Sequence, residues 1–346
     1  MSSVSVAFRY LLSLSFGLTG GAVFYLLGLP LPWMLGAMLL TLICSVSGLP
    51  LASPKSARPA MSAIIGVVLG TYFQPELFAH AGEWLFSISA LFVFIALAGG
   101  IGVTYFHFVG RMDWKTAYFA GMPGGLIEMV LAADANGADS RKVALVHSTR
   151  IFLTVMMLPP LVTWMEDAAG PASARPMMPV TVESVLLVAL LASGGALLGR
   201  LLHLPARYLM GPMLLCAALN LSGVLHDLAP PTLLVWGAQV VIGTVIGCRF
   251  IGVDWRQVIG VVTLTAGSIL AFLCLAFGVA FLLRSVMGIP LAQGVLAFAP
   301  GGVAEMSLVA IALHADAAFV ALHHVIRISV VMAVAPLVFR LLKRRT

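Results

Sequence analysis

Two segments of this sequence combine ionisable side chains with residues that interrupt helices. Each reads Pro-Gly-Gly-x-x-Glu-Met, and each is followed by a stretch that ends in His-x-x-Arg-Ile. A helix that begins after the glycines presents unpaired backbone N–H groups and a partial positive charge, which together favour an anion. The pattern therefore indicates binding of a small, anionic solute. The candidate binding residues are Pro123, Gly124, Gly125, Glu128, His147 and Arg150 in the first copy, and Pro300, Gly301, Gly302, Glu305, His324 and Arg327 in the second.

The charged residues of the two copies stand in apolar surroundings and should have partners. A His and an Arg three positions apart lie on one face of a helix. An unpaired charge in a bilayer costs several kcal/mol by most estimates. The simplest arrangement pairs Glu128 with Arg150 and Glu305 with Arg327. An unperturbed imidazole has a pKa near 6.5, which makes histidine a natural proton carrier.

A structural reading of the same residues stays open. Each Glu would then cap the N–H groups of its own helix. Each Arg would bind carbonyl groups of the interrupted backbone, and each His would be a packed, hydrogen-bonded side chain. Asp139 and Asp316 are expected to cap the helices that follow the two segments.

The composition indicates that a membrane-embedded scaffold positions these residues. Hydrophobic residues make up 61% of the 346 positions and charged residues only 9%, whereas soluble domains are about a quarter charged. Apolar runs long enough to cross a bilayer recur along the chain, which predicts an all-α, polytopic integral membrane protein. The first run is interpreted as a span and not as a signal peptide. The predicted spans are 7–28, 31–49, 59–77, 84–109, 143–165, 180–202, 207–224, 232–250, 257–283 and 320–342.

The four cysteines lie in or beside apolar runs and show no CxxC spacing. They are expected to pack as small apolar side chains. No metal site and no cofactor is predicted.

The two halves of the chain repeat one another. Gly36 aligns with Gly211 at an offset of 175 residues, and Gly66 aligns with Gly243 at an offset of 177. Both Pro-Gly-Gly segments fall between the fourth and fifth spans of their halves. Matches over nearly half the chain indicate an internal duplication. The predicted parts are a first membrane repeat (1–165), a polar, Pro-rich linker (166–179) and a second repeat (180–346).

The distribution of Lys and Arg predicts the topology, because cytoplasmic loops carry an excess of them. If each Pro-Gly-Gly segment enters the membrane and returns on the same side, each half crosses five times and the second half is inverted. Both termini then face the cytoplasm. Among the basic loop residues, only Arg175 and Arg284 then lie on the outer side of the membrane. A broken helix that crosses fully moves several further basic residues outside. That alternative fits the charge rule less well but stays open.

The sequence resembles the bacterial AbrB-duplication family of membrane proteins over its whole length. The resemblance is carried by the Leu-Pro-x-x-x-x-x-Gly pattern (Leu29 to Gly36, Leu204 to Gly211), the Gly-x-x-x-Gly spans and the two Pro-Gly-Gly-x-x-Glu-Met segments. It implies a multi-pass protein of the bacterial inner membrane. It also implies a fold similar to that of inverted-repeat cation–proton antiporters and anion transporters. Members of the family are labelled ammonia monooxygenases or regulators of gene expression.

The residues and the family resemblance suggest three function classes. Inverted repeats with broken helices are typical of secondary transporters, which predicts a transporter or exporter of a small anionic solute, with proton coupling through Glu128 and Glu305. The family's label favours a role in regulation of gene expression. That role would be indirect, because no predicted soluble segment could hold a helix-turn-helix and direct nucleic-acid binding is therefore not expected. A monooxygenase needs clustered metal ligands, and the eight histidines are scattered. The expected partners are a solute, the lipid bilayer and a second copy of the chain.

Overall fold

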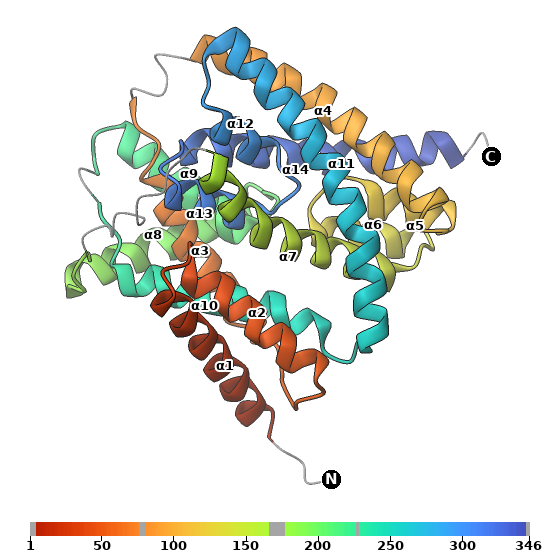
Figure 1. Ribbon diagram of the computed structural model, residues 1–346. Coiled ribbons are helices and arrows are strands. Elements are labelled where there is room, and N and C mark those ends of the chain that lie inside the picture. The colour runs from red at the N-terminus through yellow and green to blue at the C-terminus, as the bar shows by residue number, and fades with distance from the viewer. Residues whose placement is uncertain (1–4, 76–80, 166–176, 226–227, 344–346) are drawn as a thin grey trace. The chain divides into compact units, whose positions relative to one another are not determined.

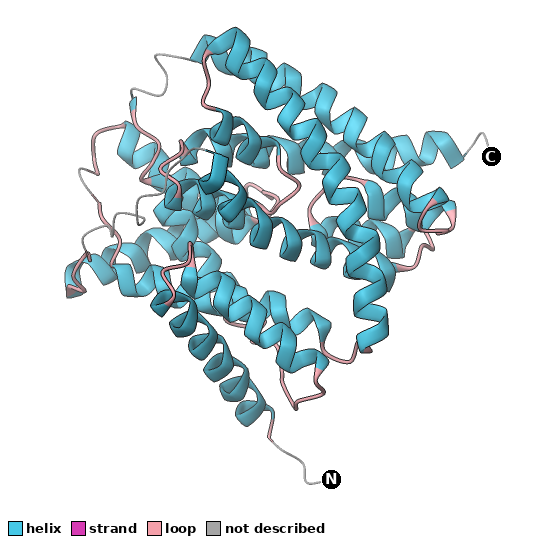
Figure 2. Ribbon diagram, viewed as in Figure 1, coloured by secondary structure: helices cyan, strands magenta, loops and turns pink. Residues whose placement is uncertain are grey.

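The chain folds into helices throughout the part that the structure describes. This computed structural model describes residues 5–75, 81–165, 177–225 and 228–343, and Figure 2 shows helices and loops, with no strand drawn in these ranges. Residues 166–176 of the predicted linker lie outside them. The first half contains α1 (Val6–Leu26), α2 (Pro32–Val46), α3 (Arg58–Gly70), α4 (Ala81–Phe108), α5 (Trp114–Gly121), α6 (Leu126–Ala135) and α7 (Ser140–Met165). The second contains α8 (Val182–Leu201), α9 (Arg207–Leu221), α10 (Thr232–Gly247), the 3-10 turn η2 (Cys248–Phe250), α11 (Trp255–Met287), α12 (Leu291–Phe298), α13 (Val303–Ala312) and α14 (Ala317–Lys343).

Within the described residues, seven helical segments are long and apolar enough to cross a membrane, by length and composition: α1, α4, α7, α8, α10 together with η2, α11 and α14. Three of the predicted spans, 31–49, 59–77 and 207–224, correspond to shorter helices of 15, 13 and 15 residues. A 15-residue helix is about 22 Å long, less than a hydrocarbon core of roughly 30 Å. Large apolar side chains such as Leu26 and Trp164 lie on the surface. The fold is that of an all-α polytopic membrane protein.

The duplication is visible in unusual backbone conformations. Leu31 and Ala206, which correspond at the offset of 175, precede α2 and α9 with φ values of 47° and 45°. Gly48 and Gly223 follow the same helices with φ values of 79° and 72°. Non-glycine residues rarely adopt such values. Their recurrence at matched positions shows that the two halves form the same turns.

The chain divides into two compact units, and each takes elements from both halves. The first unit contains α1–α3 and α8–α10 (Figure 1). Its helices approach closely at glycines: a methyl group on Gly36 would lie 2.0 Å from the Gly20 carbonyl oxygen, and one on Gly211 would lie 2.0 Å from that of Gly195. Small residues therefore allow the backbones of these helices to pack closely.

The Gly-x-x-x-Gly helices of the first unit pack across the repeat. A methyl group on Gly66 of α3 would lie 2.3 Å from the carbonyl oxygen of Leu209 in α9. One on Gly243 of α10 would lie 2.4 Å from that of Met34 in α2. Each such helix therefore packs against the second helix of the other half.

We expect Gly243→Ala to destabilise the protein, because its methyl group meets backbone atoms that cannot rotate away. Overpacking of this kind costs about 1–3 kcal/mol. Gly237→Ala on the same helix is the matched control, since a methyl group there meets open space. Thermal unfolding in detergent should show a lower Tm for Gly243→Ala and an unchanged or higher Tm for Gly237→Ala. Equal Tm values would contradict the close crossing of α2 and α10.

The second unit contains α4–α6, α11, α12 and the larger parts of α7 and α14. Its core places α5 against α14: the Tyr118 hydroxyl donates to the Ala335 carbonyl at 2.8 Å, and the rings of Phe119 and Phe339 are 4.8 Å apart. The Tyr105 hydroxyl of α4 donates to the Leu264 carbonyl of α11 at 2.9 Å. All the candidate binding residues belong to this unit.

Candidate functional site

Both Pro-Gly-Gly segments interrupt a helix, as the sequence predicts. α5 ends at Gly121 and α6 begins at Leu126, while α12 ends at Phe298 and α13 begins at Val303. The interruption does not use left-handed glycine. Gly125 has a φ of −68° and a ψ of 143°, values that any residue adopts. The backbone conformation at Gly125 therefore does not require glycine.

The glycines are needed for space. A methyl group on Gly125 would lie 2.2 Å from Oε2 of Glu128, and one on Gly302 would lie 2.2 Å from Oε2 of Glu305. A methyl group on Gly124 would lie 2.9 Å from Cγ of Met129, and one on Gly301 would lie 2.5 Å from Cγ of Met306. The spacing Gly-Gly-x-x-Glu-Met is therefore a packing unit. Each Glu carboxylate folds back over the amino end of its own helix.

In the first copy, a guanidinium and an imidazole hold the carbonyl groups of the interruption. Arg150 donates from Nη1 to the Met122 carbonyl at 3.1 Å and from Nη2 to the Gly124 carbonyl at 3.2 Å. The Nε2 atom of His147 lies 2.9 Å from the Phe119 carbonyl, and Nδ1 lies 2.9 Å from Nη2 of Arg150. A carbonyl only accepts, so His147 donates from Nε2 and accepts at Nδ1.

The second copy repeats these contacts at an offset of 177. Arg327 donates from Nη1 to the Ala299 carbonyl and from Nη2 to the Gly301 carbonyl. The Nε2 atom of His324 donates to the Leu296 carbonyl at 2.9 Å. A buried carbonyl left unpaired costs about 1–3 kcal/mol. These side chains therefore supply hydrogen bonds that the interrupted helix cannot make for itself.

The expected Glu–Arg ion pairs do not form. Within the described residues, neither Arg150 nor Arg327 has a carboxylate at ion-pair distance, although they are only 3% and 2% exposed. The carbonyls of the interruption occupy the Nη atoms, and the two carboxylates lie over the starts of α6 and α13. Glu305 is 5% exposed, whereas Glu128 is partly exposed.

The two copies meet at α14. A methyl group on Gly124 would lie 2.9 Å from Cγ1 of Val331, one helical turn beyond Arg327. A methyl group on Gly125 would lie 3.5 Å from Cγ2 of Ile328, the residue after Arg327. Several buried polar atoms of α7 and α14 have no hydrogen-bond partner within the described residues: Nε of Arg150, Nε of Arg327, Nδ1 of His324 and the hydroxyls of Thr149 and Thr154. The site thus combines two close cations with unused donors and acceptors.

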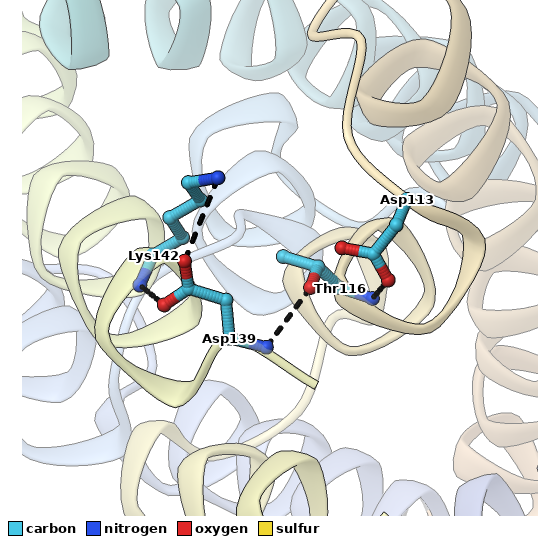
Figure 3. A network of polar contacts seen from close by, with 4 residues as sticks. All are labelled: Asp113, Thr116, Asp139 and Lys142. Carbon is cyan, nitrogen blue, oxygen red and sulfur yellow. Dashed lines mark hydrogen bonds and ion pairs between the residues drawn. The ribbon is translucent and has the colours of Figure 1, made fainter. Parts of the chain in front are cut away.

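The segment from α5 to α6 begins and ends at one place. The Asp139 N–H, just before α7, donates to the Thr116 hydroxyl in the first turn of α5 at 3.0 Å (Figure 3). A continuous helix between these positions would separate them by about 35 Å. The segment therefore forms a hairpin whose two ends lie together.

Two N-caps hold the base of this hairpin (Figure 3). The carboxylate of Asp113 accepts from the Thr116 N–H, and that of Asp139 accepts from the Lys142 N–H, both at 3.0 Å. The Asp139 cap that the sequence predicts is confirmed, and Asp316 directly precedes α14. Partial burial acts to raise the pKa of Asp113, but hydrogen bonds from Thr116 and Lys115 and the charge of Lys142 outweigh it and hold the pKa below its usual range.

We expect Thr116→Val to loosen the base of the hairpin, because the Asp139 N–H loses its acceptor without a change in side-chain shape. The loss should be about 1 kcal/mol, and a Tm lower by roughly 1–3 °C is the corresponding change. Thr263→Val is the control, since that threonine is exposed and bonds only within α11. A Tm for Thr116→Val as high as that of the control would contradict the assigned role.

Sequence reasoning found the six motif residues of each copy but missed their acceptors. The carbonyls of Phe119, Met122, Leu296 and Ala299 belong to residues without any chemical signature. Sequence reasoning also did not name Thr154. Its spacing could have indicated it, because it lies four positions after Arg150 on the same helix face. Within the described ranges, no three His, Cys, Asp or Glu side chains gather closely enough to share a metal ion.

Comparison with known proteins identifies the family. Residues 33–343 match the AbrB family, described as "Transition state regulatory protein AbrB". The chain belongs to the AbrB family. Two relatives are each 30% identical to it. "Uncharacterized protein YhjN" of Bacillus subtilis (strain 168) aligns with 93% of this chain and 90% of its own length, and "Putative regulator AbrB" of Escherichia coli (strain K12) aligns with 90% of each.

Proposed function

We propose that this AbrB-family chain is a secondary transporter of a small organic anion. One observation carries the proposal: two buried guanidinium groups each bind an interrupted helix, the first interruption packs against the helix that carries the second guanidinium, and neither group has a carboxylate partner among the described residues. Carbonyl dipoles offset only part of their charge, so an anion between them would gain both Coulomb energy and hydrogen bonds. Binding at interrupted helices is the arrangement that secondary transporters use.

In this proposal the two halves are inverted in the membrane and both termini are cytoplasmic. The hairpin base of Asp113, Thr116, Asp139 and Lys142 supports a re-entrant segment, because both ends of the hairpin then lie on one side. The Glu carboxylates over the amino ends of α6 and α13 would carry the coupling proton.

The topology is tested with Arg111→Cys and Arg141→Cys, which lie before and after the hairpin and are both exposed. Cys274 is exposed as well, so Cys274→Ser provides the background. A membrane-impermeant maleimide should label both positions from the cytoplasmic side only. Labelling of the two positions from opposite sides would contradict the re-entrant arrangement.

The function is tested in two steps. A thermal-shift screen of the purified protein compares carboxylates, phosphate and sulfate with neutral and cationic analogues of similar size. Acids that raise the Tm are then followed as uptake into proteoliposomes, with empty vesicles as the control. Stabilisation by neutral or cationic compounds alone, or by none of the compounds, would contradict the proposal.

A second candidate function is regulation of gene expression, which the name of the Escherichia coli relative favours. Such regulation would be indirect, through movement of a signalling metabolite. In that case a deletion strain should regain normal expression with the unaltered gene, but not with a variant that folds and does not transport. If the variant that does not transport restores normal expression, regulation does not depend on transport.

A further inference from the structure

The two copies of the motif are not chemically equivalent in the folded protein. In the first, Nδ1 of His147 is within hydrogen-bonding distance of Arg150, and Glu128 is partly exposed. In the second, Nδ1 of His324 has no hydrogen-bond partner among the described residues, and Glu305 is 5% exposed. The sequences of the two motifs agree at every candidate position. Packing, and not residue type, therefore makes the difference.

The unused groups of the second copy include acceptors as well as donors. His324 donates from Nε2 to the Leu296 carbonyl, so its Nδ1 carries a lone pair and can only accept. The Glu305 carboxylate, when ionised, accepts only, and it has no hydrogen bond or ion pair within the described residues. The Nε–H of Arg327 is an unused donor. Buried acceptors without donors are costly, so a bound molecule that supplies a donor would gain from each of them.

Two of these groups lie beside the start of α13. Arg327 binds the Gly301 carbonyl, and the Glu305 carboxylate lies over Gly302, the next residue. His324 lies on the same face of α14 as Arg327, three positions earlier. A ligand group at this place would meet an anionic acceptor, a neutral acceptor and a cationic donor together.

We propose that the second copy binds a hydrogen-bond donor of the substrate, so that the substrate is a carboxylate with a neighbouring hydroxyl or ammonium group. The carboxylate lies between the two guanidinium groups, and its donor group points to Glu305 and Nδ1 of His324. A simple carboxylate would leave both acceptors unpaired. Sites built to hydrogen-bond a substrate hydroxyl or amine discriminate strongly against analogues that lack it. This inference rests on the proposed function and narrows its substrate class.

The test uses acids that differ only in the donor: glycolate and glycine against acetate, lactate and alanine against propionate, and malate and aspartate against succinate. Binding to the full-length protein is measured by thermal shift and titration calorimetry. We expect at least one donor-bearing acid to bind 10-fold or more tightly than its donor-free analogue. In Glu305→Ala this ratio should fall toward one, while Glu128→Ala should keep the ratio, whatever its effect on affinity.

The outcomes separate this inference from the proposed function. If donor-free acids bind as tightly as their partners, the substrate class is wrong but anion binding stands. Stabilisation by sodium chloride that Glu305→Ala abolishes would assign the carboxylate to a cation and overturn the inference. If none of these acids binds but phosphate or sulfate does, the inference fails and the anion proposal survives. If no anion of any kind binds, both fail.

Discussion

Replacing Arg327 with alanine should abolish transport. The guanidinium holds two carbonyls of the second interruption and is one of two cations that would attract the substrate. Loss of a buried, hydrogen-bonded charge costs about 3–5 kcal/mol. A loss of this size corresponds to roughly 100-fold or more in binding. Uptake into proteoliposomes should fall to the level of empty vesicles, and Arg150→Ala should behave in the same way.

Two further variants separate binding from folding. Arg327→Lys keeps the charge but not the planar fork, so it can bind one carbonyl and not both. It should fold, with a Tm between those of the unaltered protein and Arg327→Ala, and it should transport poorly. Arg284→Ala removes an exposed arginine near the end of α11 and is the matched control. Normal transport by Arg150→Ala and Arg327→Ala, singly and combined, would show that the substrate binds elsewhere.

Much of the fold could be predicted because it repeats local patterns. Apolar runs predicted the long helices, matched glycines indicated the duplication, and the Pro-Gly-Gly segments predicted the helix interruptions. The Asp139 cap followed from its place before a helix. Each of these features depends on residues close together in the sequence, where spacing and side-chain type decide the structure.

The contacts between distant residues could not be predicted. Helix α3 of the first half packs against α9 of the second half. The spacing of the repeats does not predict this contact, because it does not indicate whether a helix packs within its own half or against the other. The acceptors for Arg150 and Arg327 are main-chain carbonyls, which every residue has. Charge pairing therefore favoured Glu128 and Glu305 as partners, although the carboxylates fold toward their own helices. Opposite charges in one sequence motif do not imply an ion pair when the backbone itself is interrupted.

The second large effect is expected for Gly302→Ala, which should impair transport while leaving the fold intact. Its methyl group would lie 2.2 Å from Oε2 of Glu305, so the carboxylate must move. Since that atom ends a flexible side chain, the movement costs little stability, and we expect a Tm within roughly 2 °C of the original. The displaced carboxylate no longer covers the amino end of α13. If it carries the coupling proton, uptake driven by a pH gradient should fall about 10-fold or more, because misplacing a proton-transfer group removes most of its contribution.

Two comparisons make this prediction specific. Gly278→Ala adds a methyl group to an open position of α11 and should change neither transport nor Tm. Glu305→Ala removes the colliding group, so Gly302→Ala should have no further effect when it is added to that variant. Additive losses of transport in the double variant would show that Gly302 acts independently of Glu305. In that case the effect of Gly302→Ala on transport would not come from displacement of the Glu305 carboxylate. Glu128 would then be the candidate for proton coupling.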